Sequence, residues 1–67
     1  MDTVFFYKDD AGEWRWHRKS ENGRIVADGG EGYQNRQDIY DITWDMFADS
    51  VDYVWPEGDE GERSSAP

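Results

Sequence analysis

The sequence has no cysteine and a single histidine, His17. Disulfides and thiolate zinc sites are therefore excluded, and one imidazole cannot form a histidine cluster. A chain this short buries only roughly 60% of its unfolded surface, so its stability needs support. Because covalent and metal-based support are missing, association with a second subunit is the remaining means. We expect a homodimer without cofactor or metal.

Positive charge is also scarce. The 67 residues include 16 acidic and only 7 basic side chains, which gives a net charge of −9. This excess repels polyanions, so nucleic acid is an unlikely partner. A strongly acidic surface is typical of a salt-adapted protein, in which concentrated cations screen the self-repulsion. We therefore expect a halophilic source.

Long apolar runs are absent as well. No stretch approaches the roughly 20 apolar residues that span a membrane. The amino terminus lacks the basic segment, apolar run and cleavage site of a secretory signal. We therefore expect a cytoplasmic protein that makes no membrane contact.

Aromatic and β-branched residues alternate with polar ones in the first half of the chain. Residues 3–8 read as a strand that ends at the turn residues Asp9–Gly12, and residues 13–19 read as the second strand. Asn22-Gly23 predicts a type I′ turn, from which residues 24–28 return as the third strand. The pattern predicts a three-stranded antiparallel meander.

The second half predicts one helix and one more strand. Asn35 is a candidate cap for a helix over residues 36–50, and residues 51–55 alternate again. The fold class is therefore α+β, a β-β-β-α-β unit with an antiparallel sheet packed on one helix. We expect this domain to occupy residues 1–56, followed by a disordered acidic tail at 57–67.

Loop lengths predict which side chains share a face. A four-residue first loop places Tyr7 opposite Trp14 and Phe5 opposite Trp16, and a two-residue second loop places Lys19 opposite Val26 and His17 opposite Asp28. We expect the helix to cover the Trp14/Trp16 face. The predicted core is Phe5, Tyr7, Trp14, Trp16, Ile25, Ala27, Ile39, Ile42, Met46 and Phe47.

Three segments occur in an order that resembles the YegP-like family of small uncharacterised proteins. They are Asp10-Ala11-Gly12-Glu13-Trp14-Arg15-Trp16, Asn22-Gly23-Arg24-Ile25-Val26-Ala27 and Gly30-Glu31-Gly32-Tyr33, and the resemblance extends roughly from Val4 to Trp55. It implies a β3-αβ unit that occurs in tandem or dimerises into one sheet. The departures are Gly30, where Ser is frequent, and an unusually Asp-rich helix. The family has no assigned reaction.

The resemblance also implies that the carboxy-terminal strands are exchanged between units. A single copy then implies a homodimer whose interface includes Val51, Tyr53, Val54 and Trp55. We expect truncation before Val51 to give an unfolded or aggregating chain, and a stable, soluble monomer would refute the exchange.

The sequence carries no catalytic signature. Gly29–Gly32 lacks the Lys and Ser/Thr of a P-loop, so these glycines are expected to turn the chain while Tyr33 anchors the loop by packing. His17 beside Asp28 could be a general base, but no nucleophile accompanies it. We therefore expect a non-enzymatic protein.

The sheet face opposite the predicted core is the candidate ligand face. A protein contact would use its aromatic and arginine side chains, and single-stranded RNA would stack on the aromatic residues beside basic ones. The protein contact is favoured because it avoids the repulsion of a polyanion by the net charge. The candidate residues are Phe6, Arg15, His17, Lys19 and Arg24.

Overall fold

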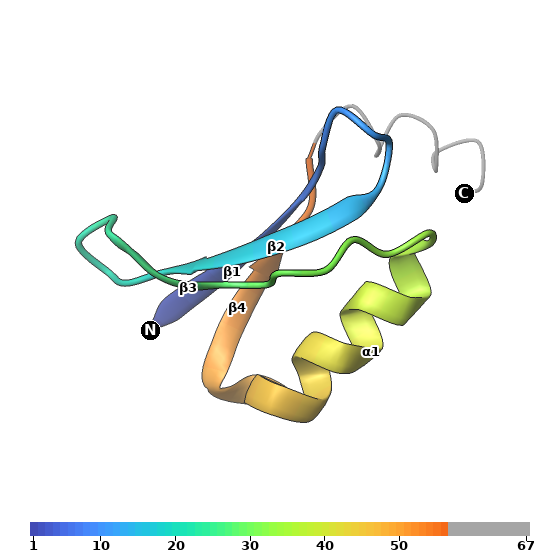
Figure 1. The fold of residues 1–67 in the computed structure, drawn as a ribbon. Helices are drawn as coiled ribbons and strands as arrows, with labels where there is room; N and C mark the ends of the chain where they lie inside the picture. Colours follow the sequence, from blue (N-terminus) through green and yellow to red (C-terminus); the bar gives the residue numbers. More distant parts are fainter. Residues whose placement is uncertain (57–67) are drawn as a thin grey trace.

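The computed structural model describes residues 1–56, and the predicted acidic tail at 57–67 lies outside them. The predicted α+β order of three strands, a helix and a fourth strand is confirmed (Figure 1). The elements are β1 (Asp2–Lys8), β2 (Trp14–Lys19), β3 (Ile25–Asp28), α1 (Arg36–Phe47), the short 3-10 helix η1 (Ala48–Ser50) and β4 (Val51–Val54).

The four strands form one sheet in the order β3-β2-β1-β4. The pairs β1–β2 and β2–β3 are antiparallel, which confirms the predicted meander. However, β4 lies parallel to β1, so the sheet is mixed instead of wholly antiparallel. A parallel neighbour requires a crossover connection, and α1 supplies it by crossing one face of the sheet (Figure 1).

The first hairpin is closed by a three-residue loop. The Asp9 N–H donates to the Glu13 carbonyl, and the Gly12 N–H donates to the Asp9 carbonyl, both at 2.9 Å. Gly12 has a φ of 81°, the left-handed conformation that closes such loops. The predicted four-residue loop was therefore too long by one residue.

This difference of one residue in loop length places every side chain of β1 on the face opposite to the predicted one. Phe6 lies opposite Trp16, and Phe5 lies opposite His17. Since successive side chains point to opposite faces, a slip of one residue exchanges the two faces of a strand. The predicted core positions of Phe5 and Tyr7 are wrong, and Val4 and Phe6 are buried instead.

The second hairpin is also closed by a three-residue loop. Ser20 and Arg24 close it through a backbone hydrogen bond, and Gly23 has a φ of 88°. The predicted type I′ turn is wrong, because Gly23 alone in this loop has a positive φ.

A register shift follows between Arg18 and Lys19. His17 still lies opposite Asp28, as predicted, but Lys19 lies opposite Ile25 instead of Val26. Ile25 is 58% exposed, so its predicted core position is wrong, whereas Ala27 packs against the core.

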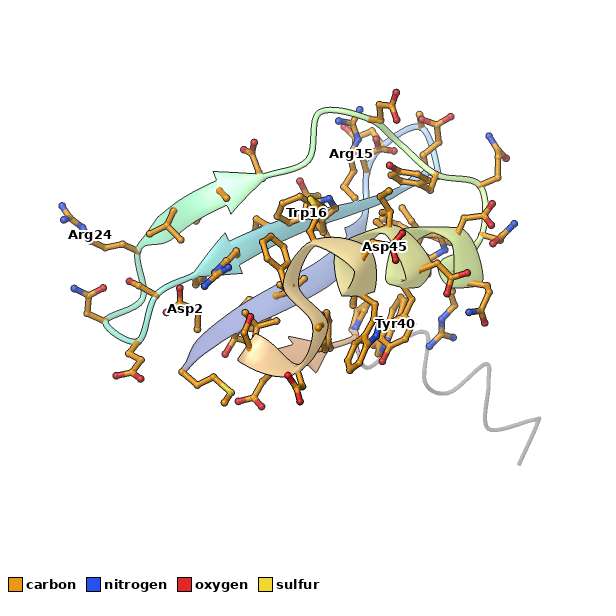
Figure 2. The ribbon with its side chains drawn as sticks, turned by 90° about the horizontal axis from the view of Figure 1, so that it is seen from below. Asp2, Arg15, Trp16, Arg24, Tyr40 and Asp45 are labelled. Atoms are coloured by element: carbon orange, nitrogen blue, oxygen red, sulfur yellow. The ribbon has the colours of Figure 1, made fainter. Side chains whose placement is uncertain are left out.

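The core lies between α1 and the sheet. Figure 2 shows Trp16 on the side of the sheet that α1 covers, and the Phe47 ring meets the Trp16 ring edge-on at 5.5 Å. The expected burial of Phe47 is therefore largely confirmed, since this side chain packs against the core. The buried apolar residues are Val4, Phe6, Trp14, Trp16, Ile39 and Val51.

The helix presents a different stripe from the predicted one. Ile39 is buried as expected, but Ile42 and Met46 are exposed, and the fully buried Thr43 occupies the next position of the stripe. The Thr43 hydroxyl donates to the Ile39 carbonyl at 3.0 Å and can do so without a polar partner from the sheet. The predicted cap is confirmed, because the Asn35 side chain accepts from the Asp38 N–H.

Gly29 is required by its contact with a core tryptophan. A Cβ atom at Gly29 would lie 2.8 Å from both Cδ1 and Cε2 of Trp16, whereas one at Gly30 would meet nothing within 4 Å. We expect Gly29→Ala to lower the free energy of unfolding by about 1–3 kcal/mol through overpacking. Gly30→Ala should leave it nearly unchanged. Urea denaturation followed by circular dichroism would measure both, and equal effects would contradict the close approach.

Candidate protein-interaction face

The sheet has one face that no helix of the described chain covers (Figure 1). We call it the open face. It is the face opposite the buried side chains of β1 and β2, because side chains alternate along a strand. Its residues, from the observed registers, are Thr3, Phe5, Tyr7, Arg15, His17, Lys19, Ile25, Asp28, Asp52 and Val54.

An aromatic cluster occupies the middle of the open face. The His17 ring lies 5.6 Å from the Phe5 ring and 5.4 Å from the Tyr7 ring, centroid to centroid. The Lys19 ammonium lies over the Phe5 ring at 5.3 Å, within the range of a cation–π interaction. Tyr7 is 38% exposed and Val54 is 41% exposed, so the cluster combines accessible apolar area with one cation.

Arg15 is fixed at the edge of this face by an ion pair. Its Nε donates to the Asp9 carboxylate at 2.9 Å, and its Nη1 donates to the Gly30 carbonyl at 3.3 Å. The pKa of Asp9 is lowered, first by the hydrogen bond from the Glu13 N–H and also by Arg15. Arg15 therefore contributes shape and hydrogen bonds to the open face more than unbalanced positive charge.

The structure places only three of the five predicted ligand residues on the open face. Arg15, His17 and Lys19 share the open face, as the alternation of β2 indicates. Phe6 does not, because it lies on the opposite face and is 2% exposed, so that assignment was wrong. Arg24 lies outside the strands at the end of the second hairpin, and Figure 2 shows it far along the molecule from Arg15.

Sequence reasoning missed Phe5, Tyr7 and Val54 among the residues of this face. Phe5 and Tyr7 were placed in the core, and Val54 was assigned to a subunit interface. The signal that could have found Phe5 and Tyr7 is the loop type, because a three-residue loop ending in a left-handed glycine fixes the register.

We expect His17 to make the stability of the protein depend on pH. Desolvation lowers its pKa below the usual 6.5, the Lys19 charge lowers it further, and the Asp28 charge opposes them. Below pH 6.5 the unfolded chain therefore takes up the proton before the folded chain does. The contribution of His17 to stability is complete above that pH and decreases as the pH falls toward the folded-state pKa.

We therefore expect the urea midpoint of the wild-type protein to fall between about pH 7.5 and about pH 5.5, and His17→Gln to reduce that fall. Equilibrium urea titrations at the two pH values would measure it. The variant keeps every other titratable group, so the difference between the two proteins measures the contribution of His17 alone. Equal decreases in the two proteins would contradict the lowered pKa.

The predicted interface residues belong to the core region in the described chain. Val51 is 4% exposed, and Tyr53 and Trp55 pack against the core cluster. Tyr53 also donates its hydroxyl to the Ala48 carbonyl at 2.7 Å, and burial raises its pKa. Val54 alone of the four faces away from α1. The pairing of β4 with β1 is described within one chain, so the exchange between subunits stays a prediction.

The glycine-containing loop is anchored by Tyr33, as expected. Its backbone exchanges two hydrogen bonds with Trp14, at 2.7 and 2.9 Å, and its side chain packs against the core. Burial raises the pKa of its hydroxyl. Within residues 1–56, no group of three or more His, Asp or Glu side chains is placed to hold a metal ion.

Comparison with known protein families found a match over slightly less than half of the chain. The model of DUF1508, described as a domain of unknown function, matches residues 9–41. The YegP-like proteins are the DUF1508 family, so the predicted resemblance is confirmed. Neither the curated proteins nor the solved structures gave a significant match. None of the helices described here has the length and apolar character needed to cross a bilayer.

Proposed function

We propose that the chain is a non-enzymatic, homodimeric interaction module of the cytoplasm whose open face contacts a protein partner. The observation that carries this proposal is the aromatic cluster of Phe5, Tyr7 and His17 on an uncovered sheet face. Aromatic side chains and arginine are enriched in protein interfaces, whereas lysine and acidic residues are depleted. The open face carries the aromatic cluster together with Arg15, and Lys19, Asp28 and Asp52 also lie on it.

Charge also favours a protein over RNA as the partner. Arg15 is already paired with Asp9, and Arg24 lies outside the open face. Lys19 is thus the one lysine or arginine of this face without a carboxylate partner among residues 1–56. A nucleic-acid site would need several such cations to overcome the repulsion by a net charge of −9.

Capture of partners from the native cell at high salt tests the open face. We expect wild-type protein to retain partners after RNase treatment and Tyr7→Ser to lose them. Met46→Ser is the matched control, because Met46 is an exposed apolar residue of α1 on the other side of the molecule. Equal capture by both variants would contradict the protein contact, and loss on RNase treatment would favour the RNA alternative.

The dimer is supported by the short connection between α1 and β4. Ala48 begins this connection with a φ of 48° and a ψ of −130°, a conformation that is costly for any residue with a Cβ atom. A strained hinge favours domain swapping, because an exchanged β4 could make the same contacts on a neighbour while the hinge extends. A regulatory role in a salt-adapted cell fits such a module.

Light scattering during size exclusion at several protein concentrations tests the exchange. We expect a dimer for the wild-type chain and a larger monomer fraction for Ala48→Gly, since glycine adopts a positive φ without strain. Ala11→Gly, in the exposed first turn, is the matched control and should assemble as the wild type does. A wild-type chain that is monomeric at every concentration would contradict the homodimer.

A further inference from the structure

A shallow groove that is largely open to solvent lies between α1 and β4, on the side of the sheet opposite the open face, and its volume is about 480 Å³. Small-molecule sites usually have volumes of roughly 300–1,000 Å³. Figure 2 shows Tyr40 on the side of α1 that is toward β4. The lining residues are Arg36, Gln37, Tyr40, Tyr53 and Trp55.

The walls of the groove are aromatic and held in place by the core. The Trp55 ring stacks on the buried Phe6 ring at 4.0 Å, with 19° between the planes. The Tyr40 and Tyr53 rings meet edge-on at 5.3 Å. Because Phe6 is buried in the core, these rings are already arranged, and little conformational entropy would be lost when a ligand binds.

Arg36 supplies a cation whose donors have no partner among residues 1–56. Its guanidinium carbon lies 4.6 Å from the centroid of the Trp55 ring and 5.7 Å from that of the Trp14 ring. Stacking on an indole covers the flat face of a guanidinium and leaves its in-plane N–H groups available.

The other arginines near the core differ from Arg36 in this respect. Arg15 and Arg18 each donate from Nε to an aspartate at 2.9 Å. Arg36 makes no ion pair and no side-chain hydrogen bond with residues 1–56, although these include twelve acidic side chains. A fixed guanidinium with free in-plane donors binds a carboxylate through two parallel hydrogen bonds.

We propose that this groove binds a small aromatic monocarboxylate. The carboxylate pairs with Arg36, and the ring of the ligand packs among Tyr40, Tyr53 and Trp55. A monoanion is preferred over a phosphate dianion because Arg36 is the one cation among the described residues that line the groove. In addition, Gln37 donates to the Asp41 carboxylate at 2.8 Å, which places a negative charge beside the groove. This site is separate from the protein contact proposed for the open face.

Titration of the full, nitrogen-15-labelled chain with benzoate tests the proposal. The indole N–H signals and the Arg36 Nε–H signal should shift in a saturable way, with a Kd of about 1 mM or below. Benzamide has the same shape without the charge and should bind at least about tenfold more weakly. Phenyl phosphate should also bind more weakly than benzoate.

Variants then separate Arg36 from general charge. We expect Arg36→Gln to weaken benzoate binding about tenfold or more, and Arg36→Lys, which keeps the charge but loses the paired donors, to weaken it less. Arg24→Gln is the matched control and should bind as the wild type does, because Arg24 is exposed at a hairpin end remote from the groove.

Three results would overturn the site. They are the absence of a saturable shift, equal binding of benzoate and benzamide, and unchanged benzoate binding in a folded Arg36→Gln protein. If Arg36→Gln does not fold, unchanged binding by Arg36→Lys together with equal benzamide binding would overturn it. A failed partner capture by the open face would leave this site unaffected.

Discussion

Phe6→Ala should unfold most of the protein, whereas Phe5→Ala should leave it folded. Phe6 is 2% exposed and stacks on the Trp55 ring at 4.0 Å. Replacing a buried phenylalanine by alanine costs about 3–5 kcal/mol, from lost transfer energy and a cavity. Small domains often have total stabilities near the lower end of about 5–15 kcal/mol, so this loss is comparable with the whole.

Phe5 is the matched control because it differs from Phe6 by one position and one face. It lies on the open face opposite His17, so its removal leaves no cavity in the core. We expect Phe5→Ala to cost about 1 kcal/mol or less, as surface substitutions usually do. Thermal and urea denaturation followed by circular dichroism would measure both. A larger loss for Phe5→Ala would mean that the first hairpin has a different register.

A chain that ends at Ser50 should show no cooperative unfolding transition. It loses Val51, which is 4% exposed, and the Trp55 ring that covers Phe6 and Trp14. It also leaves β1 without its parallel partner. Removal of one large buried side chain already costs about 3–5 kcal/mol, so the loss of the whole strand exceeds the stability expected for a small domain.

The matched control is a chain that ends at Pro56, which keeps β4 and Trp55. Circular dichroism and one-dimensional NMR would show a folded control and an unfolded or aggregated shorter chain. A chain ending at Ser50 with a cooperative transition would show that β4 is dispensable for the core. The core needs β4 whether the strand comes from the same chain or from a second one, so this truncation tests only the contribution of β4 to the core. The comparison with Ala48→Gly tests the exchange between subunits.

The sequence predicted the order of the elements because each has its own local signal. Alternation marked β2, Asn35 capped α1, and both large tryptophans of β2 were placed correctly in the core. In β1 both faces are apolar, with Val4 and Phe6 on one and Phe5 and Tyr7 on the other, so alternation could not choose between them. The loop length decides, and a slip of one residue there reverses the strand.

The helix and the last strand were less predictable for other reasons. Thr43 has a polar side chain, yet it can be buried because its hydroxyl donates hydrogen bonds to carbonyls of its own helix. Hydrophobicity therefore favoured Ile42 and Met46, which are exposed. The parallel direction of β4 depends on the end of the sheet at which α1 leaves the chain. No local sequence pattern specifies this position.

The candidate sites also depended on information beyond local pattern. The open-face residues of β2 followed from its alternation, whereas Phe5 and Tyr7 could be added only after the first hairpin was placed. The groove beside Arg36 brings together α1 and the residues at the end of β4, which are separated along the chain and meet only through packing.

The pairing of β1 with β4 also has a consequence for folding kinetics. The two hairpins join neighbouring segments and can form early, but Asp2 and Val51, which are paired, lie near opposite ends of the described chain. Such a distant contact pays its loop-closure entropy before it gains stability, so it forms late. Until then the free edge of β1 can accept the β4 of another chain. Protein concentration during refolding should therefore determine how much material follows the intermolecular route.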